Sequence, residues 1–316
     1  MKPAELDTWR EAAAIAGHTR EYVASLMKPG AKLIDLSLAG HQRLEELGGK
    51  AAFPLQISVN HIAAHYCAYV GDESELKEND LVKVDCGVHI DGYVADTAMT
   101  VDLSKDGRHA DLLAASKEAL AAAIDLAGPD VEVVEIGRVV EKAIRARGKN
   151  PIRNLTGHGV GQWQVHRAPQ IPSVPSGRGR LKAGTCVAIE PFATDGPGLI
   201  NEKGDAHVFM AKKSGKKLKG VDGKVLEAIR EFNGLPFGSR DLLLHFPYEA
   251  VSSTLNAMLR ANLLMLYPPL VEKKGTFVAQ FEHTLYVHDG GVEVLTAATE
   301  PSRAVPERST GPVTKA

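Results

Sequence analysis

The chain has 316 residues, of which 44% are hydrophobic, and its formal net charge is −2. This composition supports a sizeable core and excludes a mainly disordered chain, and without a basic excess we expect no specific nucleic-acid partner. No apolar run approaches the roughly 18 residues of a membrane helix, and the charged N-terminus lacks a secretory h-region. Three scattered cysteines exclude a disulfide scaffold, so we expect a cytoplasmic protein with no membrane partner.

The first half of the chain is predicted to contain two helices, a hairpin and two more helices. Apolar residues recur at helical spacing over 8–27 and 33–47, and again over the Ala-rich segments 110–127 and 133–147. A β-like stretch over 53–59 follows the second helix. Leu81–Val88 is then expected to pair with Tyr93–Val101 in a hairpin that turns at Asp91-Gly92.

Two parts of the chain resemble each other. Offset by 100 residues, Pro29 matches Pro129, and offset by 105, an apolar strand ending at Asp85 matches one ending at Glu190. We interpret this as the duplication of a helix–helix–strand unit. If the halves pack about a pseudo-twofold axis, the two carboxylates approach each other at the centre.

Residues 200–265 interrupt this repetition. A strand-like segment over 207–211 leads into a lysine-rich loop, which we expect to be solvated, and helices are expected at about 221–233, 238–246 and 249–264. The pattern indicates an insertion carried on the main domain.

The chain then returns to β structure. Residues 276–287 and 292–295 are expected to form a hairpin joined by a Gly-containing turn, and residues 299–316, with three prolines and no apolar period, are typical of a disordered tail. The expected organisation is a main domain over 1–199 and 266–298, the insertion over 200–265, and this tail.

Five side chains suited to a hard metal ion stand where ordinary strands would not place them. Asp85 and Asp96 fall near the same level of the predicted hairpin, where two anions repel unless a cation lies between them. His158 lies in a glycine-rich stretch, and Glu190 and Glu282 stand in or at the end of apolar strands. Four carboxylates and an imidazole suit Mn, Fe, Co or Zn in a paired site.

Each of these residues alone has an ordinary structural explanation. An Asp beside a Gly in a strand is more often a turn or cap residue than a ligand, and a lone strand Glu usually faces solvent. His65 and His166 read individually as partly buried, hydrogen-bonded histidines. The joint pattern, rather than any single member, predicts the metal site.

Short motifs in a familiar order run through the chain. They are Phe53-Pro54, Ala63-Ala64-His65-Tyr66, Asp85-Cys86-Gly87 with Asp96, Gly157-His158, Val165-His166, Ile189-Glu190-Pro191-Phe192, Tyr267-Pro268-Pro269 and Gln280-Phe281-Glu282-His283-Thr284. Together they resemble the methionine aminopeptidase family, and the last two resemble its type II branch especially closely. Because a helix is expected almost at the start of the sequence, the chain resembles the archaeal form of that branch. The resemblance covers about residues 5 to 297. It implies an α+β pita-bread (creatinase/aminopeptidase-like) fold with pseudo-twofold halves and a helical, winged-helix-like insertion.

The resemblance implies a metal-ligand role for each of the five residues. Two divalent ions (Co, Mn, Fe or Zn) would be held: Asp85 would chelate one, and Asp96 and Glu282 would bridge both. His158 and Glu190 would complete the second, and Glu190 would also move a proton from the metal-bridging water as it becomes hydroxide.

The resemblance also implies how substrate is bound. His65 and His166 would contact the scissile peptide and stabilise charge on the tetrahedral intermediate. Phe53, Val165 and Tyr267 would line an apolar pocket for the methionine side chain.

The implied activity is that of a monomeric methionyl aminopeptidase. It would remove the initiator methionine from nascent polypeptides when the second residue is small. The ribosome is a possible partner. The long charged N-terminal extension of eukaryotic type II relatives has no counterpart here, so there is no evidence for docking through such an extension.

Two other functions on the same fold are weighed against this one. Proliferation-associated relatives lose metal ligands and act as non-catalytic binding proteins, whereas the complete ligand set here favours an enzyme. Proline-specific di-metal peptidases such as prolidase carry a separate N-terminal domain, for which there is no room before Phe53. Gln56 stands where many relatives have Asn, and we expect His61 not to bind metal.

Overall fold

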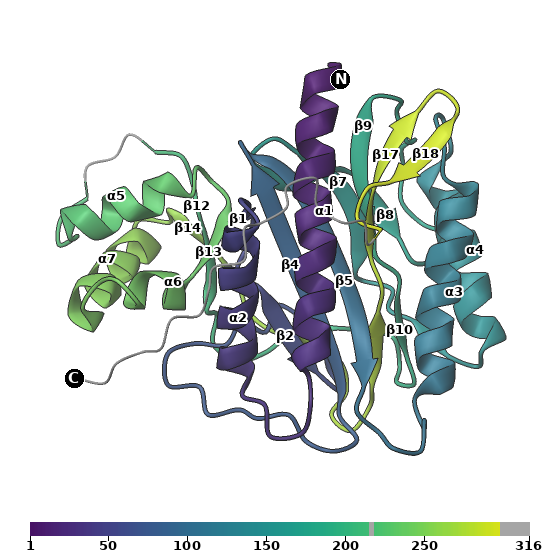
Figure 1. The fold of residues 1–316 in the computed structure, drawn as a ribbon, viewed down its shortest axis with the longest axis horizontal. Helices are drawn as coiled ribbons and strands as arrows, with labels where there is room; N and C mark the ends of the chain where they lie inside the picture. Colours follow the sequence, from purple (N-terminus) through teal and green to yellow (C-terminus); the bar gives the residue numbers. More distant parts are fainter. Residues whose placement is uncertain (215–217, 298–316) are drawn as a thin grey trace, which may run out of the picture.

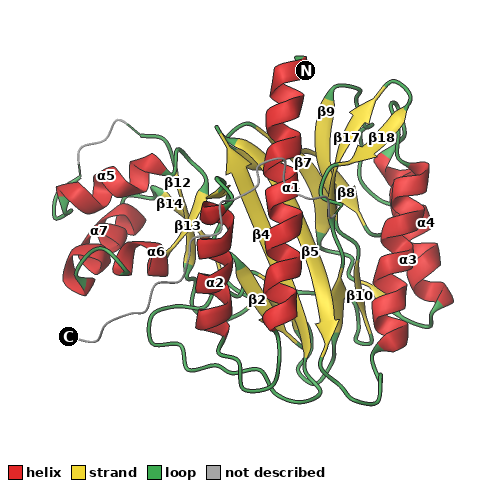
Figure 2. Cartoon of the chain, viewed as in Figure 1, coloured by secondary structure: helices red, strands yellow, loops and turns green. Residues whose placement is uncertain are grey.

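A computed structural model describes residues 1–214 and 218–297. Figures 1 and 2 show two β-rich halves, each covered by a pair of helices, with a smaller helical unit at one side. Within the described residues the helices are α1 (Pro3–Leu26), α2 (Leu33–Glu46), α3 (Ala110–Leu126), α4 (Val133–Ala146), α5 (Gly223–Glu231), α6 (Ser239–Leu243) and α7 (Tyr248–Arg260). None of them is both long and apolar enough to cross a bilayer.

The first half is built on the predicted hairpin. Strand β4 (Leu81–Ile90) pairs antiparallel with β5 (Tyr93–Asp102), β1 (Lys50–Ala51) and β2 (Gln56–Val59), and α1 crosses β4 and β5 (Figure 1). The turn at Asp91 and Gly92, with φ of 50° and 85°, is confirmed, because both residues adopt the positive φ that a tight type I′ hairpin needs. Residues that pair directly across two antiparallel strands have their side chains on the same face of the sheet. Asp85 pairs with Ala98 and Gly87 pairs with Asp96, so Asp85 and Asp96 are diagonal neighbours on one face.

The second half repeats the first at the predicted offset. Helix α4 lies 100 residues after α2 with the same length, and β6 (Asn150–Pro151) lies 100 residues after β1. A five-stranded sheet follows the order β18 (Gly291–Val294), β17 (His283–His288), β9 (Thr185–Ile189), β7 (Thr156–Gly161) and β8 (Gln164–Pro172). A three-stranded sheet joins β16 (Val278–Gln280), β10 (Phe192–Thr194) and β6.

Two hydrophobic cores hold the halves. One contains Ile15 of α1 and Val84 of β4, and the other contains Ile136 of α4 and Val187 of β9; these four side chains are almost completely buried. Because each core lies between helices and a sheet, the opposite sheet faces are left to meet at the centre of the molecule.

The residues of the predicted insertion have a core of their own. Strands β12 (Val208–Ala211), β13 (Pro236–Gly238) and β14 (Leu264–Tyr267) form a sheet against which α5, α6 and α7 pack. A second small sheet, of β11 (Asn201–Glu202), β15 (Leu270–Val271) and β3 (Ile62–Ala64), joins its edges to the first half.

Two predicted strands are corrected by the structure. The strand expected over 53–59 begins only at Gln56, since Pro54 cannot donate to a ladder. The strand expected over 276–287 is broken between β16 and β17, because the backbone amide of Glu282 leaves the strand direction and donates to the carbonyl of Ala98 at 3.0 Å. The tail predicted over 299–316 lies outside the described residues.

Candidate metal centre and peptide site

All ten residues predicted for the site line one cavity of about 280 Å³ between the halves. They are Phe53, His65, Asp85, Asp96, His158, Val165, His166, Glu190, Tyr267 and Glu282. The structure therefore brings together side chains from nine separate strands, strand ends or connecting segments, spread over more than two thirds of the chain.

The backbone explains how the five predicted ligands converge. Asp85 and Asp96 come from the β4–β5 hairpin, His158 from β7, Glu190 from the end of β9, and Glu282 from the break between β16 and β17. Strands β7 and β9 pair directly, and a Cβ at Gly157 would stand 2.5 Å from the carbonyl oxygen of Ala188. Glycine is required there because a side chain would force apart the strands that carry His158 and Glu190.

Distances within the cluster fit a metal centre. Nε2 of His158 lies 3.7 Å from Oδ2 of Asp96 and 3.6 Å from Oε1 of Glu190. One ligand atom each from Asp96, His158 and Glu282 lie within 4.8 Å of one another. The amide of Gln280 donates to Oε2 of Glu190 at 3.2 Å and to Oε2 of Glu282 at 3.4 Å.

Four buried carboxylates this close repel one another. Burial raises the pKa of Asp85 to about 7. Burial, and then the neighbouring carboxylates, raise the pKa of Asp96, Glu190 and Glu282 well above the ordinary range. Burial, and then His166, lower the pKa of His158 to about 3, which keeps the imidazole neutral and able to donate a lone pair.

The donor set fits divalent cations. Oδ1 of Asp85, Oδ1 of Asp96 and Oε1 of Glu282 are buried without a hydrogen-bond partner, a state that costs free energy unless a cation or its water satisfies them. Carboxylate oxygens with one imidazole nitrogen are ligands for Mn, Fe, Co or Zn. Bound cations would also relieve the repulsion that raises the pKa values.

The other end of the cavity is apolar, with two histidines at the boundary. The ring of His65 makes an edge contact with Tyr267 at 5.6 Å, and the ring of His166 makes one with His158 at 4.4 Å. His65 has a φ of 65°, and its amide donates to Oε1 of Gln56 at 2.8 Å. Burial lowers the pKa of His65 to about 4 and also lowers that of His166, so both rings are neutral.

Sequence reasoning missed several residues of this site, among them Gln280, which contacts two of the predicted ligands, and three residues that line the cavity. Gln280 had a signal, because it stands two residues before Glu282 and a period of two puts both on one face. Gln56 was noted only as unusual. Val208 and Pro236 line the cavity from β12 and β13, and no motif in the sequence indicated these two residues, although Tyr267 of β14 in the same sheet was predicted.

Comparisons with known proteins agree with these features. Residues 7–289 match the model of metallopeptidase family M24. The chain is 43% identical over 291 residues to a methionine aminopeptidase of Thermococcus onnurineus, covering 90% of this chain and 97% of the relative. It is 39% identical over 290 residues to a methionine aminopeptidase of Methanocaldococcus jannaschii, covering 90% and 96%.

Solved structures share the fold at lower identity. A thermophilic Arx1 superposes with a TM-score of 0.83 at 19% identity, covering 93% of this chain and 91% of that one. A methionine aminopeptidase of Thermotoga maritima has a TM-score of 0.67 at 22% identity, with 94% and 98% covered. A prolidase of Pyrococcus furiosus has a TM-score of 0.61 at 17% identity, with 94% and 64% covered. The α+β pita-bread fold is confirmed.

Proposed function

The chain belongs to metallopeptidase family M24, and we propose that it is a methionine aminopeptidase of the archaeal kind that removes N-terminal methionine by metal-dependent hydrolysis. The observation that carries this is the convergence of all ten predicted residues on one cavity, together with about 40% identity to archaeal methionine aminopeptidases over most of the chain.

We propose that Asp85, Asp96, His158, Glu190 and Glu282 hold two divalent ions. Asp96 and Glu282 would be shared by the two ions, Asp85 would bind one, and His158 with Glu190 would complete the other. The three buried oxygens without partners and the neutral imidazole support this arrangement. Two bound cations lower the pKa of a shared water and polarise a peptide carbonyl.

The side chains around the ions supply proton transfer and positioning. Glu190 accepts the proton of the attacking water and delivers it to the leaving amine, with its carboxylate oriented by the amide of Gln280. His65 and His166, neutral at working pH, donate N–H groups to the scissile peptide as charge develops on it.

Recognition of the first residue is assigned to the apolar end of the cavity. Phe53, Val165 and Tyr267 pack against the methionine side chain, which is unbranched and polarisable. Binding of the substrate's free amine at the ions would restrict cleavage to the first residue, and we propose that a small second residue is accommodated best.

The remaining proposals concern the molecule in the cell. We propose a monomer in the cytoplasm that acts on nascent polypeptides; the three cysteines are buried and unpaired, which fits a reducing compartment. Ribosome binding stays a prediction. We also propose the division into a catalytic domain over 1–199 and 266–298 and an insertion over 200–265, whose separate core supports it.

Peptide hydrolysis tests the function directly. Manganese-loaded protein is expected to convert Met-Ala-Ser to Met and Ala-Ser, resolved by mass. N-acetyl-Met-Ala-Ser, which lacks the free amine, should stay intact, and Met-Lys-Ser should be cleaved far more slowly. Release of Ala-Ser from the acetylated peptide, or none from the free peptide, would reject the proposal.

A further inference from the structure

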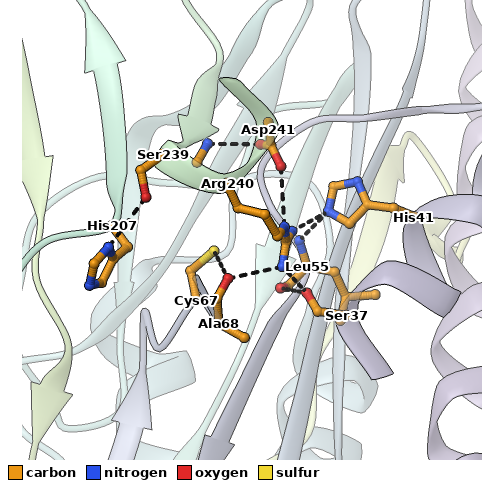
Figure 3. Close-up of polar contacts among 10 residues, drawn as sticks. Ser37, His41, Leu55, Cys67, Ala68, His207, Ser239, Arg240 and Asp241 are labelled. Atoms are coloured by element: carbon orange, nitrogen blue, oxygen red, sulfur yellow. Dashed lines mark hydrogen bonds and ion pairs between the residues drawn. The ribbon is translucent and has the colours of Figure 1, made fainter. Parts of the chain in front are cut away.

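A buried arginine joins the insertion to the rest of the molecule. Arg240 of α6 is only 1% exposed, and its guanidinium donates to Oγ of Ser37 at 2.7 Å and to the carbonyl of Ala68 at 3.1 Å (Figure 3). A second terminal nitrogen lies 3.0 Å from Nε2 of His41. Its own neighbour, Asp241, supplies a carboxylate 3.4 Å from Nε.

The partners of this arginine hold one wall of the cavity. The hydroxyl of Ser37 donates to the carbonyl of Leu55 at 2.7 Å, and the amide of Leu55 donates to Nε2 of His41 at 3.1 Å. Both backbone groups of Leu55 are therefore fixed by α2 side chains that contact Arg240. Leu55 is two residues after Phe53 and one before Gln56, and both of those line the cavity.

The same arginine is also tied to the part of the cavity wall that the insertion supplies. Asp241 accepts a hydrogen bond from the amide of Gly238 at 2.8 Å, at the end of β13. Pro236 of β13 lines the cavity, as does Val208, whose register partner in β13 is Gly238. One side chain thus links the Phe53 wall from the first half to the Val208–Pro236 wall from the insertion.

A buried guanidinium is a poor way to gain stability. Its desolvation is costly, and replacing such a group with an apolar side chain of similar size is often neutral for stability. Its rigid fork of donors, however, fixes geometry between several acceptors at once. An arginine in this place is better explained by the spacing it sets than by the free energy of unfolding.

We propose that Arg240 is a positioning residue that sets the width of the apolar pocket, and with it the preference for methionine over branched first residues. This inference rests on the proposed function, because it assumes that the first side chain of the substrate enters between Phe53 and Pro236.

Peptide selectivity of three arginine variants tests this role. Arg240→Met keeps the length and loses the donors, Arg240→Lys keeps the charge with a single donor group, and Arg260→Met removes an exposed arginine of α7 as a control. Each manganese-loaded protein is assayed with Met-Ala-Ser and Leu-Ala-Ser. In Arg240→Met, the kcat/KM for Met-Ala-Ser divided by the kcat/KM for Leu-Ala-Ser should fall about tenfold relative to the parent. The change should come from a higher KM for Met-Ala-Ser, with kcat for this peptide within about threefold of the parent value. Arg240→Lys should recover part of the ratio, and Arg260→Met should match the parent.

The outcomes separate this inference from the proposed function. A parent that never cleaves Met-Ala-Ser overturns both. If the parent is active and folded Arg240→Met keeps the parent's Met-over-Leu ratio, including the case in which both peptides are slowed by the same factor, only the positioning role is overturned. If circular dichroism shows that Arg240→Met does not fold, the Ser37→Ala variant is used instead, because it removes only the hydroxyl that links Arg240 to Leu55. A lowered Met-over-Leu ratio in Ser37→Ala supports the positioning role, and an unchanged ratio rejects it.

Discussion

Glu190 differs from Asp96 in its access to the open part of the cavity. Its side chain is 14% exposed, whereas that of Asp96 is 5% exposed, and it lies 3.6 Å from His158 as well as within reach of Gln280. A carboxylate that lies beside the proposed ion site and is partly exposed to solvent is suited to moving a proton. Asp96, enclosed and without a partner for Oδ1, is suited to holding charge in place.

We predict that Glu190→Gln keeps most of the bound metal and loses kcat by about 10²–10⁴-fold, because an amide cannot accept the proton from water. Elemental analysis and initial rates on Met-Ala-Ser measure the two effects. Glu202→Gln, on an exposed strand end, is the control and should behave as the parent. A rate for Glu190→Gln within a few-fold of the parent would remove Glu190 from proton transfer.

His41 gives stability a pH dependence with a definite sign. Burial lowers the pKa of His41 to about 4, with Asp241 opposing this shift and Arg240 reinforcing it. As the pH falls, the unfolded chain, with an ordinary histidine pKa of about 6.5, binds a proton before the folded chain does. The contribution of neutral His41 to the free energy of unfolding is therefore complete above pH 6.5 and is lost as the pH falls toward 4.

We predict that the free energy of unfolding falls less between pH 7 and pH 5 in His41→Gln than in the parent, and that the two decreases differ by about 1–2 kcal/mol. Urea unfolding at the two pH values measures the difference, and it is insensitive to any pH-independent cost of the substitution. His245→Gln, at an exposed position, should keep the slope of the parent. Identical slopes for His41→Gln and the parent would contradict a buried neutral imidazole.

At the level of whole elements, the site depends on places where backbone must pass close to another group. A Cβ at Gly87 in β4 would stand 2.1 Å from Cε1 of Phe53, so this glycine lets the aromatic ring pack directly against the strand that carries Asp85. Gly157 has the same function between β7 and β9. Strand pairing alone would not place ring and carboxylate in one cavity.

We predict that Gly87→Ala costs about 1–3 kcal/mol of stability, because the ring of Phe53 must move. KM for Met-Ala-Ser should rise about tenfold as the pocket changes shape, with a smaller effect on kcat. Thermal unfolding and steady-state kinetics check both. Gly223→Ala, at the start of α5 with nothing within 4 Å of the added carbon, should be neutral or slightly stabilising. An unchanged KM in Gly87→Ala would show that the ring does not form the pocket.

How well each element could be predicted follows from its local chemistry. The helices of both halves and the β4–β5 hairpin were predicted because an amphipathic period and an Asp-Gly turn are local signals. Strands β7 and β8 were not assigned, since three of the six residues of β7 are glycines, which disfavour strands, and β8 has many exposed residues. The break before β17 was missed because its cause, the bond from Glu282 to Ala98, is a contact 184 residues away in sequence.

For the whole molecule, the convergence of the site residues and part of the cavity wall could be predicted from the sequence, and the insertion's contribution to that wall could not. The duplication indicated that Asp85 and Glu190 would meet, and both line the cavity. The contribution of Val208 and Pro236 depends on how the insertion packs, which no local pattern encodes. The fold itself does not select a function, since an Arx1, a prolidase and methionine aminopeptidases all share it. Function rests on the side chains in the cavity and on the closer sequence relatives.

Metal content measured together with turnover tests the central claim, that five converging side chains hold two catalytic cations. Protein loaded with manganese and freed of excess should contain about two ions per chain and cleave Met-Ala-Ser. Chelation should abolish cleavage, and added Mn²⁺ should restore it. Asp96→Asn should lose both ions and rate, while Asp125→Asn, at an exposed position of α3, should lose neither. Full cleavage by protein shown by elemental analysis to hold no metal would contradict the account.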